Sequence, residues 1–324
     1  MFAAPRLRPA LDLLHRVPLP AAAHAQAQPP RAAHAQAQPP RAAHAQAQPP
    51  RAAHAQAQPP RAAHAHDQPP RAAHAQAQPP RAAHDQQARP REAVAITAIC
   101  DLGCGAGELT RLLAARWPHA DVVGVDSSDD MLARARAQAP AGIRWQLGDI
   151  ATWKPAAPVD LVYSNAALHW LDDHERLFPH LLDQLAPGGV LAVQMPLSWA
   201  SPSHRILREL LAGDDSLAAV PAALRERYLR PPVHAPEVYH RWLAPRVARL
   251  DIWTTEYLQV LEGPDPVLAW VQGSALRPIL AALGEAEKAR FLAIYGQRLA
   301  HAYPARDDGT TLFPFPRLFL VATV

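Results

Sequence analysis

From Val94 onward the sequence alternates short apolar, β-branched runs with amphipathic stretches of helical spacing. This alternation is typical of a parallel sheet whose strands are joined by crossover helices. The predicted strands cover residues 94–100, 121–125, 143–147, 159–163, 190–195, 247–260 and 317–324. The predicted helices cover residues 108–117, 129–138, 173–185 and a long segment at 266–302. We therefore expect the α/β class: a doubly wound, mostly parallel seven-stranded sheet, with helical cap segments at about residues 197–245 and 265–304.

Residues 21–90 form a low-complexity region of seven tandem decapeptides of the type RAAHAQAQPP. Paired prolines every ten residues exclude a continuous helix, because each proline removes a backbone donor and restricts the residue before it. The repeat has no large apolar side chain to bury. We expect a disordered insert between an N-terminal helix in residues 1–20 and an α/β domain in residues 91–324. Its evenly spaced histidines bind metal weakly at most, so no metal site is expected.

Charge and cysteine content exclude several other classes of protein. Residues 21–90 hold seven arginines and two aspartates, so a chain of formal charge +3 is slightly acidic elsewhere. This argues against a nucleic-acid partner. The two cysteines, Cys100 and Cys104, make neither a disulfide framework nor a zinc site, which fits a reducing cytoplasm. Asp12, His15 and Arg16 interrupt the first apolar run, and no later run is long enough for a membrane span.

A glycine-rich loop follows the first predicted strand, in the run from Asp101 to Gly107, and a predicted helix begins directly after it. Glycines at such a junction let the backbone approach a bound molecule, while the helix N-terminus offers free N–H groups. The spacing is Gly-x-Gly-x-Gly, not the Gly-x-Gly-x-x-Gly of dinucleotide-binding proteins. Asp101 before the loop would repel a pyrophosphate but not the zwitterionic tail of a sulfonium cofactor. The loop alone leaves both interpretations open.

Acidic residues also follow the next two predicted strands. Asp126 ends the run Val-Val-Gly-Val-Asp, where a carboxylate can accept both hydroxyls of a ribose. Asp149 follows Gly148 after the third strand, where it either accepts the amino group of adenine or serves in a turn. With Asp101, these residues place three carboxylates at successive strand ends. The set favours S-adenosylmethionine over a nicotinamide cofactor.

The run DLVYSNAALHWL at residues 160–171 carries a more specific resemblance. With the glycine loop, Asp126 and Asp149, it resembles the class I S-adenosylmethionine-dependent methyltransferases and, among them, the trans-aconitate 2-methyltransferase family. Similar segments lie at residues 177–181, 190–196, 251–253, 276–278 and 315–319, and the resemblance covers about residues 6–20 and 93–324. It implies a carboxyl O-methyltransferase that converts trans-aconitate, or a similar small polycarboxylic acid, into a monomethyl ester.

The resemblance also implies which residues form the site. Those expected at S-adenosylmethionine are Asp101, Gly103, Gly105, Gly107, Asp126, Ser127, Asp149, Ile150 and Asn165. Those expected at the acid are Arg277, Arg317, His169, Trp170, His204, Arg208, Tyr239 and Tyr257. Arg277 and Arg317 are the first choices, because a guanidinium binds a carboxylate through two parallel hydrogen bonds. No catalytic base is expected, because a carboxylic acid with a pKa of about 4 is already ionised at neutral pH.

Other interpretations stay open at this point. The same fold acts on other acids, including acyl groups on carrier proteins, and a nucleotide-binding module without catalysis would keep the same loop. His169, Arg277 and Arg317 also have purely structural interpretations, as a core histidine, a packed aliphatic stem and a surface strand residue. A nucleic-acid amine methyltransferase is not expected, because Ser164-Asn165-Ala166-Ala167 lacks the amide cradle of those enzymes. We expect a monomer.

Overall fold

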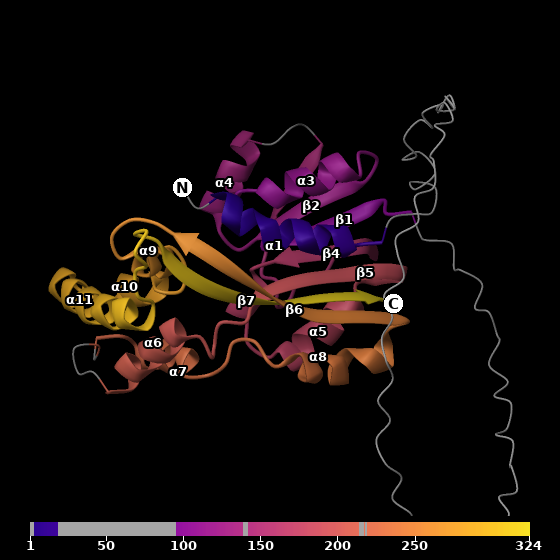
Figure 1. Cartoon of the computed structure of the whole chain (residues 1–324). Helices are drawn as coiled ribbons and strands as arrows, with labels where there is room; N and C mark the ends of the chain where they lie inside the picture. The colour runs from indigo at the N-terminus through magenta and orange to yellow at the C-terminus, as the bar shows by residue number, and fades with distance from the viewer. Residues whose placement is uncertain (1–2, 19–94, 139–141, 214–216, 218) are drawn as a thin grey trace, which may run out of the picture. The chain divides into compact units, whose positions relative to one another are not determined.

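The computed structural model describes residues 3–18, 95–138, 142–213, 217 and 219–324, and the insert predicted at 21–90 lies outside them. The described strands are β1 (Ala98–Leu102), β2 (Asp121–Asp126), β3 (Ile143–Leu147), β4 (Val159–Asn165), β5 (Leu185–Pro196), β6 (Arg249–Leu261) and β7 (Thr311–Thr323). They form one sheet in the order β3-β2-β1-β4-β5-β7-β6 (Figure 1). The first five strands are parallel, and β7 is antiparallel to β5 and β6. The predicted fold class is confirmed.

Helices cover both faces of this sheet (Figure 1). One face carries α1 (Ala3–Arg16), α3 (Glu108–Arg116) and α4 (Asp129–Gln138). The other carries α5 (His174–Leu182) and α8 (Pro236–Leu243). Alternate residues of a strand point to opposite sides of the sheet. The residues on both sides are apolar, as is typical of a parallel sheet that is covered by helices. Ile99 thus packs with α1 and α3, while its neighbour Cys100 packs with α5 and α8.

The remaining helices form a cap with a hydrophobic core of its own. They are α6 (Pro202–Gly213), α7 (Ala222–Tyr228), α9 (Pro266–Gln272), α10 (Arg277–Ala282) and α11 (Glu285–Ala302). The helical segment predicted at 266–302 is therefore three helices. Gly273 ends α9, Pro278 lies in the first turn of α10, where a missing N–H is tolerated, and Gly284 precedes α11.

The long strand β7 joins the sheet to the cap, and it begins six residues before the predicted strand. Residues 317–323 pair with both β5 and β6, whereas residues 311–316 pair with β6 alone. Pro314 and Pro316 lie in this one-sided half, where a residue without an N–H costs little. The same half carries Phe313 into the core of the cap. The cap is thus built on an extension of the sheet.

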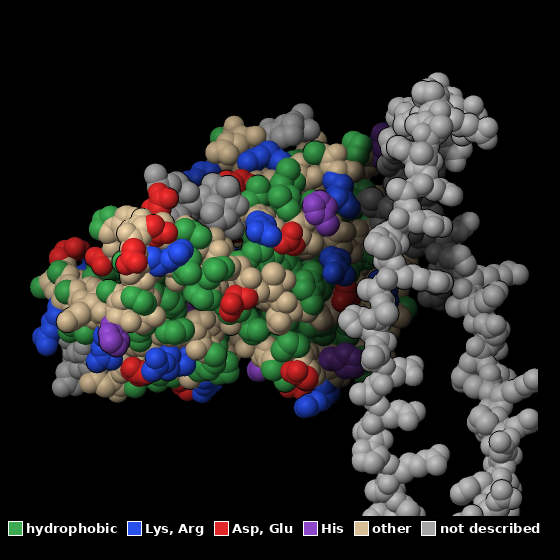
Figure 2. Space-filling view, viewed as in Figure 1, with side chains coloured by type: hydrophobic (Ala, Val, Ile, Leu, Met, Phe, Trp, Pro, Cys, Tyr) green, Lys and Arg blue, Asp and Glu red, His purple; other side chains and the backbone are tan. Residues whose placement is uncertain are grey.

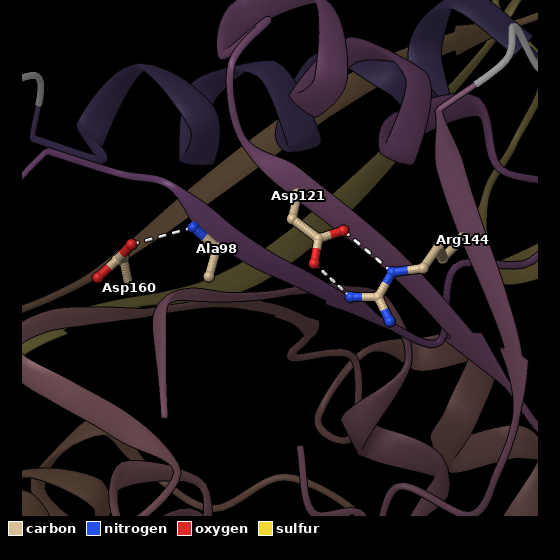
Figure 3. A network of polar contacts seen from close by, with 4 residues as sticks. All are labelled: Ala98, Asp121, Arg144 and Asp160. Atoms are coloured by element: carbon tan, nitrogen blue, oxygen red, sulfur yellow. Dashed lines mark hydrogen bonds and ion pairs between the residues drawn. The ribbon is translucent and has the colours of Figure 1, made fainter. Parts of the chain in front are cut away.

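Polar contacts at the amino ends of the strands fix their register (Figure 3). Asp160 of β4 accepts a hydrogen bond from the backbone N–H of Ala98 in β1, at 3.0 Å. Arg144 of β3 binds the carboxylate of Asp121 in β2, with its Nε 3.0 Å from Oδ1. This pair is more than half exposed, so it contributes at most about 1 kcal/mol to stability. All these contacts lie at the edge opposite to the carboxyl ends of the parallel strands.

The N-terminal helix α1 makes two hydrogen bonds to tyrosines of the sheet. Tyr163 of β4 donates its hydroxyl to the carbonyl of Ala10 at 2.8 Å. Tyr257 of β6 donates to the carboxylate of Asp12 at 2.6 Å. These bonds link α1 to strands that lie far away in the sequence. Among the described residues, no helix combines the length and the apolar character needed to cross a membrane.

Candidate active site

The loop between β1 and α3 is shaped by three glycines, Gly103, Gly105 and Gly107, all with positive φ angles. Gly103 has a φ of 76°, and a Cβ added there would lie 2.1 Å from the Cβ of Ala167. Only glycine fits this close approach. At Gly105 the nearest atom to such a Cβ would be the methyl of Met131, at 3.4 Å. The loop therefore packs tightly against Ala167, two residues after β4, and Met131 lies beside its centre.

Asp101, at the end of β1, lies beneath this loop and is only 2% exposed. Its carboxylate accepts a hydrogen bond from the hydroxyl of Thr110 in α3 at 2.6 Å. Burial raises the pKa of Asp101 to about 7, and the Thr110 hydrogen bond opposes the shift. A cation next to this carboxylate would favour its ionised form. Asp101 is thus suited to a positively charged group close to the loop.

Asp126, at the end of β2, holds the glycine loop from the other side. Its Oδ2 accepts a hydrogen bond from the N–H of Gly105 at 2.8 Å, and its Oδ1 accepts one from the N–H of Ser128 at 2.9 Å. Each carboxylate oxygen keeps a second lone pair for a ligand hydroxyl. The neighbouring Ser127 and Asp149, beyond β3, are exposed, and Asp149 accepts from the N–H of Ala151 at 2.9 Å. These polar groups surround the carboxyl ends of β2 and β3.

Asn165 ends β4, and its side-chain oxygen is buried without a hydrogen-bond partner among the described residues. The Nδ1 atom of His169, four residues further along the chain, is also buried without a hydrogen-bond partner among the described residues. Buried polar atoms nearly always have partners, so two such atoms close together in the chain indicate a ligand. Ile150 is buried and would lie 3.5 Å from a Cβ at Gly103, so it forms part of the apolar floor. Polar groups suited to S-adenosylmethionine thus continue from β1 to β4.

A cavity of about 120 Å³ lies between the carboxyl ends of β4 and β5 and the cap. The short helix η1 (Leu168–Trp170), directly after β4, contributes His169 and Trp170 to its lining. The cap contributes His204 and Arg208 of α6, together with residues of α7 and α9. The further lining residues are Pro196, Ser198, Trp199, Leu207, Arg227, Tyr228, Arg230, Pro232, Trp270, Val271, Ser274, Ala275 and Phe315.

The charged residues of this lining are all arginines: Arg208, Arg227 and Arg230. Within the described residues, no aspartate or glutamate lines the cavity. Charges elsewhere are mixed, because acidic and basic side chains are interspersed over the face that Figure 2 shows. The cavity is therefore a local concentration of positive charge, which suits a ligand with several carboxylates.

Each arginine is held by the protein but keeps donors for a ligand. Arg208 donates to the carbonyl of Trp199 at 2.6 Å and stacks on its ring at 3.7 Å. Arg227 donates to the carbonyl of Trp170, and Arg230 pairs with Glu226. A guanidinium has five N–H donors, so one or two such bonds leave a face for a carboxylate. The anchored side chains are thus partly oriented before any acid binds.

Two histidines in the cavity remain neutral at physiological pH. Burial lowers the pKa of His169 to about 3, and the nearby Arg317, His174, His204 and Arg227 act in the same direction. Burial, and then Arg208, lowers the pKa of His204 to about 4. Neutral imidazoles add hydrogen-bonding groups but no charge. The positive charge available to an acid therefore comes from the arginines.

Of the residues predicted to contact the acid, His169, Trp170, His204 and Arg208 line this cavity. Arg317 lies beside it. Its side chain is buried, donates to the side-chain oxygen of Gln194 at 2.8 Å and stacks on Phe315, a lining residue, at 4.7 Å. The possibility that Arg317 is a surface strand residue is therefore excluded.

Three residues predicted to contact the acid do not line this cavity. Arg277 is exposed at the first position of the short helix α10, and it does not line the cavity. Tyr239 of α8 is buried under the other face of the sheet, and its hydroxyl binds His174. Tyr257 is held by Asp12 of α1. Aromatic and basic side chains near the sheet were thus not sufficient criteria for the cavity.

Arg227 and Arg230 were not predicted, although they supply two of the three cationic side chains of the lining. They flank Tyr228 at the end of α7, just before Pro231 and Pro232. No feature of the local sequence distinguishes them from the neighbouring Arg225, whose side chain donates to the carbonyl of Leu217 instead. Only the folded path of α7 brings these two residues to the cavity.

A comparison with known protein families gives an independent assignment of this region. The family model described as "Methyltransferase domain" covers residues 99–189, from β1 to the first half of β5. The fold, the glycine loop and this match define the chain as an S-adenosylmethionine-dependent methyltransferase of the doubly wound α/β class.

Similar proteins narrow the class to one family. The chain is 47% identical over 231 residues to trans-aconitate 2-methyltransferase of Azoarcus sp. (strain BH72), which covers 69% of this chain and 86% of that protein. It is 47% identical over 229 residues to the Pseudomonas aeruginosa (strain UCBPP-PA14) enzyme of the same name, with 70% and 82% covered. The corresponding Klebsiella pneumoniae (strain 342) protein is 45% identical over 224 residues, with 69% and 85% covered. The chain belongs to the trans-aconitate 2-methyltransferase family, as the sequence resemblance predicted.

Proposed function

We propose that this enzyme methylates a carboxylate of trans-aconitate, or a closely similar polycarboxylic acid, in the arginine-lined cavity next to the glycine loop. The observation that carries this assignment is the lining itself, in which three arginines face the cavity and no described acidic residue does. The relatives from Azoarcus and Pseudomonas aeruginosa are named for this activity, which supports the free polyacid over an acyl-carrier substrate or a module without catalysis.

The carboxyl edge of β1 to β4 suits S-adenosylmethionine. In this proposal Asp126 accepts the ribose hydroxyls, Asp149 accepts the adenine amino group, and Asp101 faces the positively charged tail through the loop. The buried side-chain oxygen of Asn165, which has no hydrogen-bond partner among the described residues, supports a ligand at this edge. The cofactor, when bound, supplies an electrophilic methyl group on its sulfonium.

The chain's own contribution to the reaction is orientation. A substrate carboxylate is ionised at neutral pH, so its oxygen attacks without the help of a base. Arg208, Arg227 and Arg230 hold the other carboxylates, which aligns the reacting oxygen and limits its motion. The apolar lining, including Trp199 and Trp270, excludes water and so strengthens these ion pairs. Transfer of the cofactor's methyl group to this oriented oxygen would give a monomethyl ester, with S-adenosylhomocysteine as the leaving product.

A panel assay tests this assignment. Enzyme and S-adenosylmethionine are incubated with trans-aconitate, with other tricarboxylates and with matched mono- and dicarboxylates, and the esters are identified by mass spectrometry. We expect the highest kcat/KM for trans-aconitate and a fall with each carboxylate removed. Binding of S-adenosylhomocysteine without esterification of any polyacid would overturn the proposed substrate class.

We also propose that the enzyme acts as a monomer in the cytoplasm. Cys100 and Cys104 are buried, free thiols, which supports a reducing compartment. Light scattering after size-exclusion chromatography tests the first point, with one chain per particle as the expected result.

A further inference from the structure

A buried chain of hydrogen bonds links the helix η1 to α8 on the far side of His174. The Nε2 atom of His174 lies 2.9 Å from the carbonyl oxygen of Leu168, the first residue of η1. Its Nδ1 atom lies 2.7 Å from the hydroxyl of Tyr239 in α8. That hydroxyl accepts a further hydrogen bond from the backbone N–H of His234, at 3.2 Å. His174 and Tyr239 are both about 2% exposed or less.

Only one assignment of hydrogens satisfies every donor and acceptor of this hydrogen-bond network. A carbonyl only accepts, so Nε2 of His174 carries a hydrogen. The backbone N–H of His234 donates to the Tyr239 oxygen, which leaves the single Tyr239 hydrogen to bond Nδ1. His174 is thus the neutral Nε2–H tautomer, with every polar atom paired. Burial lowers its pKa, and His234 acts in the same direction, while the Leu168 and Leu171 carbonyls and Asp172 act against it. A fully satisfied buried network of this kind rigidifies the elements that it joins.

The elements at the two ends of this chain both contribute to the cavity. Leu168 is followed directly by His169 and Trp170, which line the cavity. His234 lies two residues after Pro232, in the segment that carries Arg227 and Arg230 and that also contacts η1 through the Arg227–Trp170 hydrogen bond. The network therefore connects the turn after β4 with the wall that carries two of the three arginines. Neither His174 nor Tyr239 lines the cavity.

We propose that His174 and Tyr239 are positioning residues, whose hydrogen bonds set the distance between the η1 turn and the arginine wall around the acid. Orientation is the chain's main contribution to methyl transfer, so a wall that moves by a fraction of an ångström lowers the rate. This inference rests on the proposed function. It also gives Tyr239 a role in catalysis that acts through His174 and not through contact with the substrate.

The Tyr239→Phe variant tests the proposal, because it removes one hydroxyl and keeps the packing. We expect kcat/KM for trans-aconitate to fall about tenfold, mostly through kcat, while the Kd of S-adenosylhomocysteine stays unchanged. The matched control is Tyr163→Phe, which removes another buried hydroxyl bond, from β4 to the Ala10 carbonyl. It should lower Tm comparably and leave kcat/KM unchanged.

Two substitutions at His174 give a second readout. His174→Gln keeps an N–H donor for the Leu168 carbonyl, whereas His174→Leu keeps a similar volume without a donor, so the Gln variant should retain more kcat. In the wild-type enzyme, ¹⁵N NMR should show the neutral Nε2–H tautomer of this histidine. Equal kinetics for Tyr239→Phe and Tyr163→Phe, in a wild type that esterifies trans-aconitate, would overturn the positioning role. A wild type without that activity would instead contradict the proposed function.

Discussion

The two halves of the active site are built from the chain in different ways. The cofactor edge comes from short local motifs, each at the end of one of the neighbouring strands β1 to β4. The acid cavity comes from five separate segments between residues 169 and 315, in η1, α6, α7, α9 and the first half of β7. The first half is therefore fixed by the sheet, whereas the second depends on how the cap packs on it.

This difference predicts different responses to substitution. A change in the glycine loop acts on rigid backbone contacts, so it should affect folding and cofactor binding together. A change at a cavity arginine acts on one side chain that is anchored at the edge of a space, so it should affect turnover alone. Substitutions in the two halves therefore separate the two contributions.

The largest effect is expected at Gly103, where the glycine loop touches Ala167 just after β4. Gly103→Ala combines a positive φ with a Cβ 2.1 Å from that of Ala167, so unfolding free energy should fall by about 2–4 kcal/mol. Gly309→Ala is the matched control, because Gly309 has a φ of 77° but no atom within 4 Å of the added Cβ. It should cost only about 1 kcal/mol. Equal losses of stability by chemical denaturation would show that the close approach to Ala167 is unimportant.

A smaller effect, measured as a loss of cofactor affinity, is expected at Asp126. The Asp126→Ala variant removes the proposed acceptor of two ribose hydroxyls, so affinity for S-adenosylhomocysteine should fall by about 1.5–3 kcal/mol in calorimetry. Asp129→Ala, at the exposed start of α4, serves as the control and should bind normally. Unchanged binding by the Asp126 variant would remove the ribose assignment.

The cavity half is tested by a pair of arginines, one inside and one outside. Arg208→Lys keeps the charge but loses the planar fork that stacks on Trp199, so kcat/KM for trans-aconitate should fall at least about tenfold, or about 1.4 kcal/mol. Arg277→Lys, on the exposed start of α10, should be kinetically silent. The reverse result would return Arg277 to the substrate site and place the cavity elsewhere.

A pH-dependent effect is expected from Asp101, whose pKa burial raises to about 7. Between about pH 4 and 7 this carboxyl is protonated in the folded state and ionised in the unfolded state, so its contribution to stability falls as the pH rises. Asp101→Asn stays neutral throughout and should gain Tm relative to wild type at pH 8, but not at pH 4. Parallel Tm profiles for the two proteins would contradict the raised pKa.

The smallest effect is expected from the decapeptide repeat at residues 21–90. Its composition offers no large apolar side chain. Deleting residues 25–88 and joining the ends with a short Gly/Ser linker should keep kcat/KM for trans-aconitate within a few-fold of wild type. A folded but inactive deletion variant would assign the repeat a role in catalysis.

Most of the fold was predictable because hydrophobic periodicity and the glycines and prolines that end helices and strands are local features of the sequence. The seven strands and the glycine loop follow from neighbouring residues. The boundaries that moved were decided by long-range pairing. Residues 311–316 entered β7 despite Pro314 and Pro316 because they pair on one side only. Leu185 left the predicted helix because it pairs with Val159 of β4.

The parts of the candidate site that come from short, continuous stretches of sequence were easier to predict than the parts assembled from distant segments. The acidic residues of the cofactor edge follow strand ends, so the sequence places them together. The cationic wall depends on the path of α7 around the cavity, and no spacing distinguishes Arg227 from Arg225. Arg277 lies outside this cavity for the same reason, because its position in α10 depends on the breaks at Gly273 and Gly284.

The central claim is that the arginine cavity holds the acid beside the cofactor edge, and a crystal structure with S-adenosylhomocysteine and trans-aconitate tests it most directly. We predict that the cofactor product contacts Asp126 and Asp149, and that carboxylates of the acid lie within hydrogen-bonding distance of Arg208 and of Arg227 or Arg230. An acid bound outside the cavity, for example against Arg277, would contradict the account.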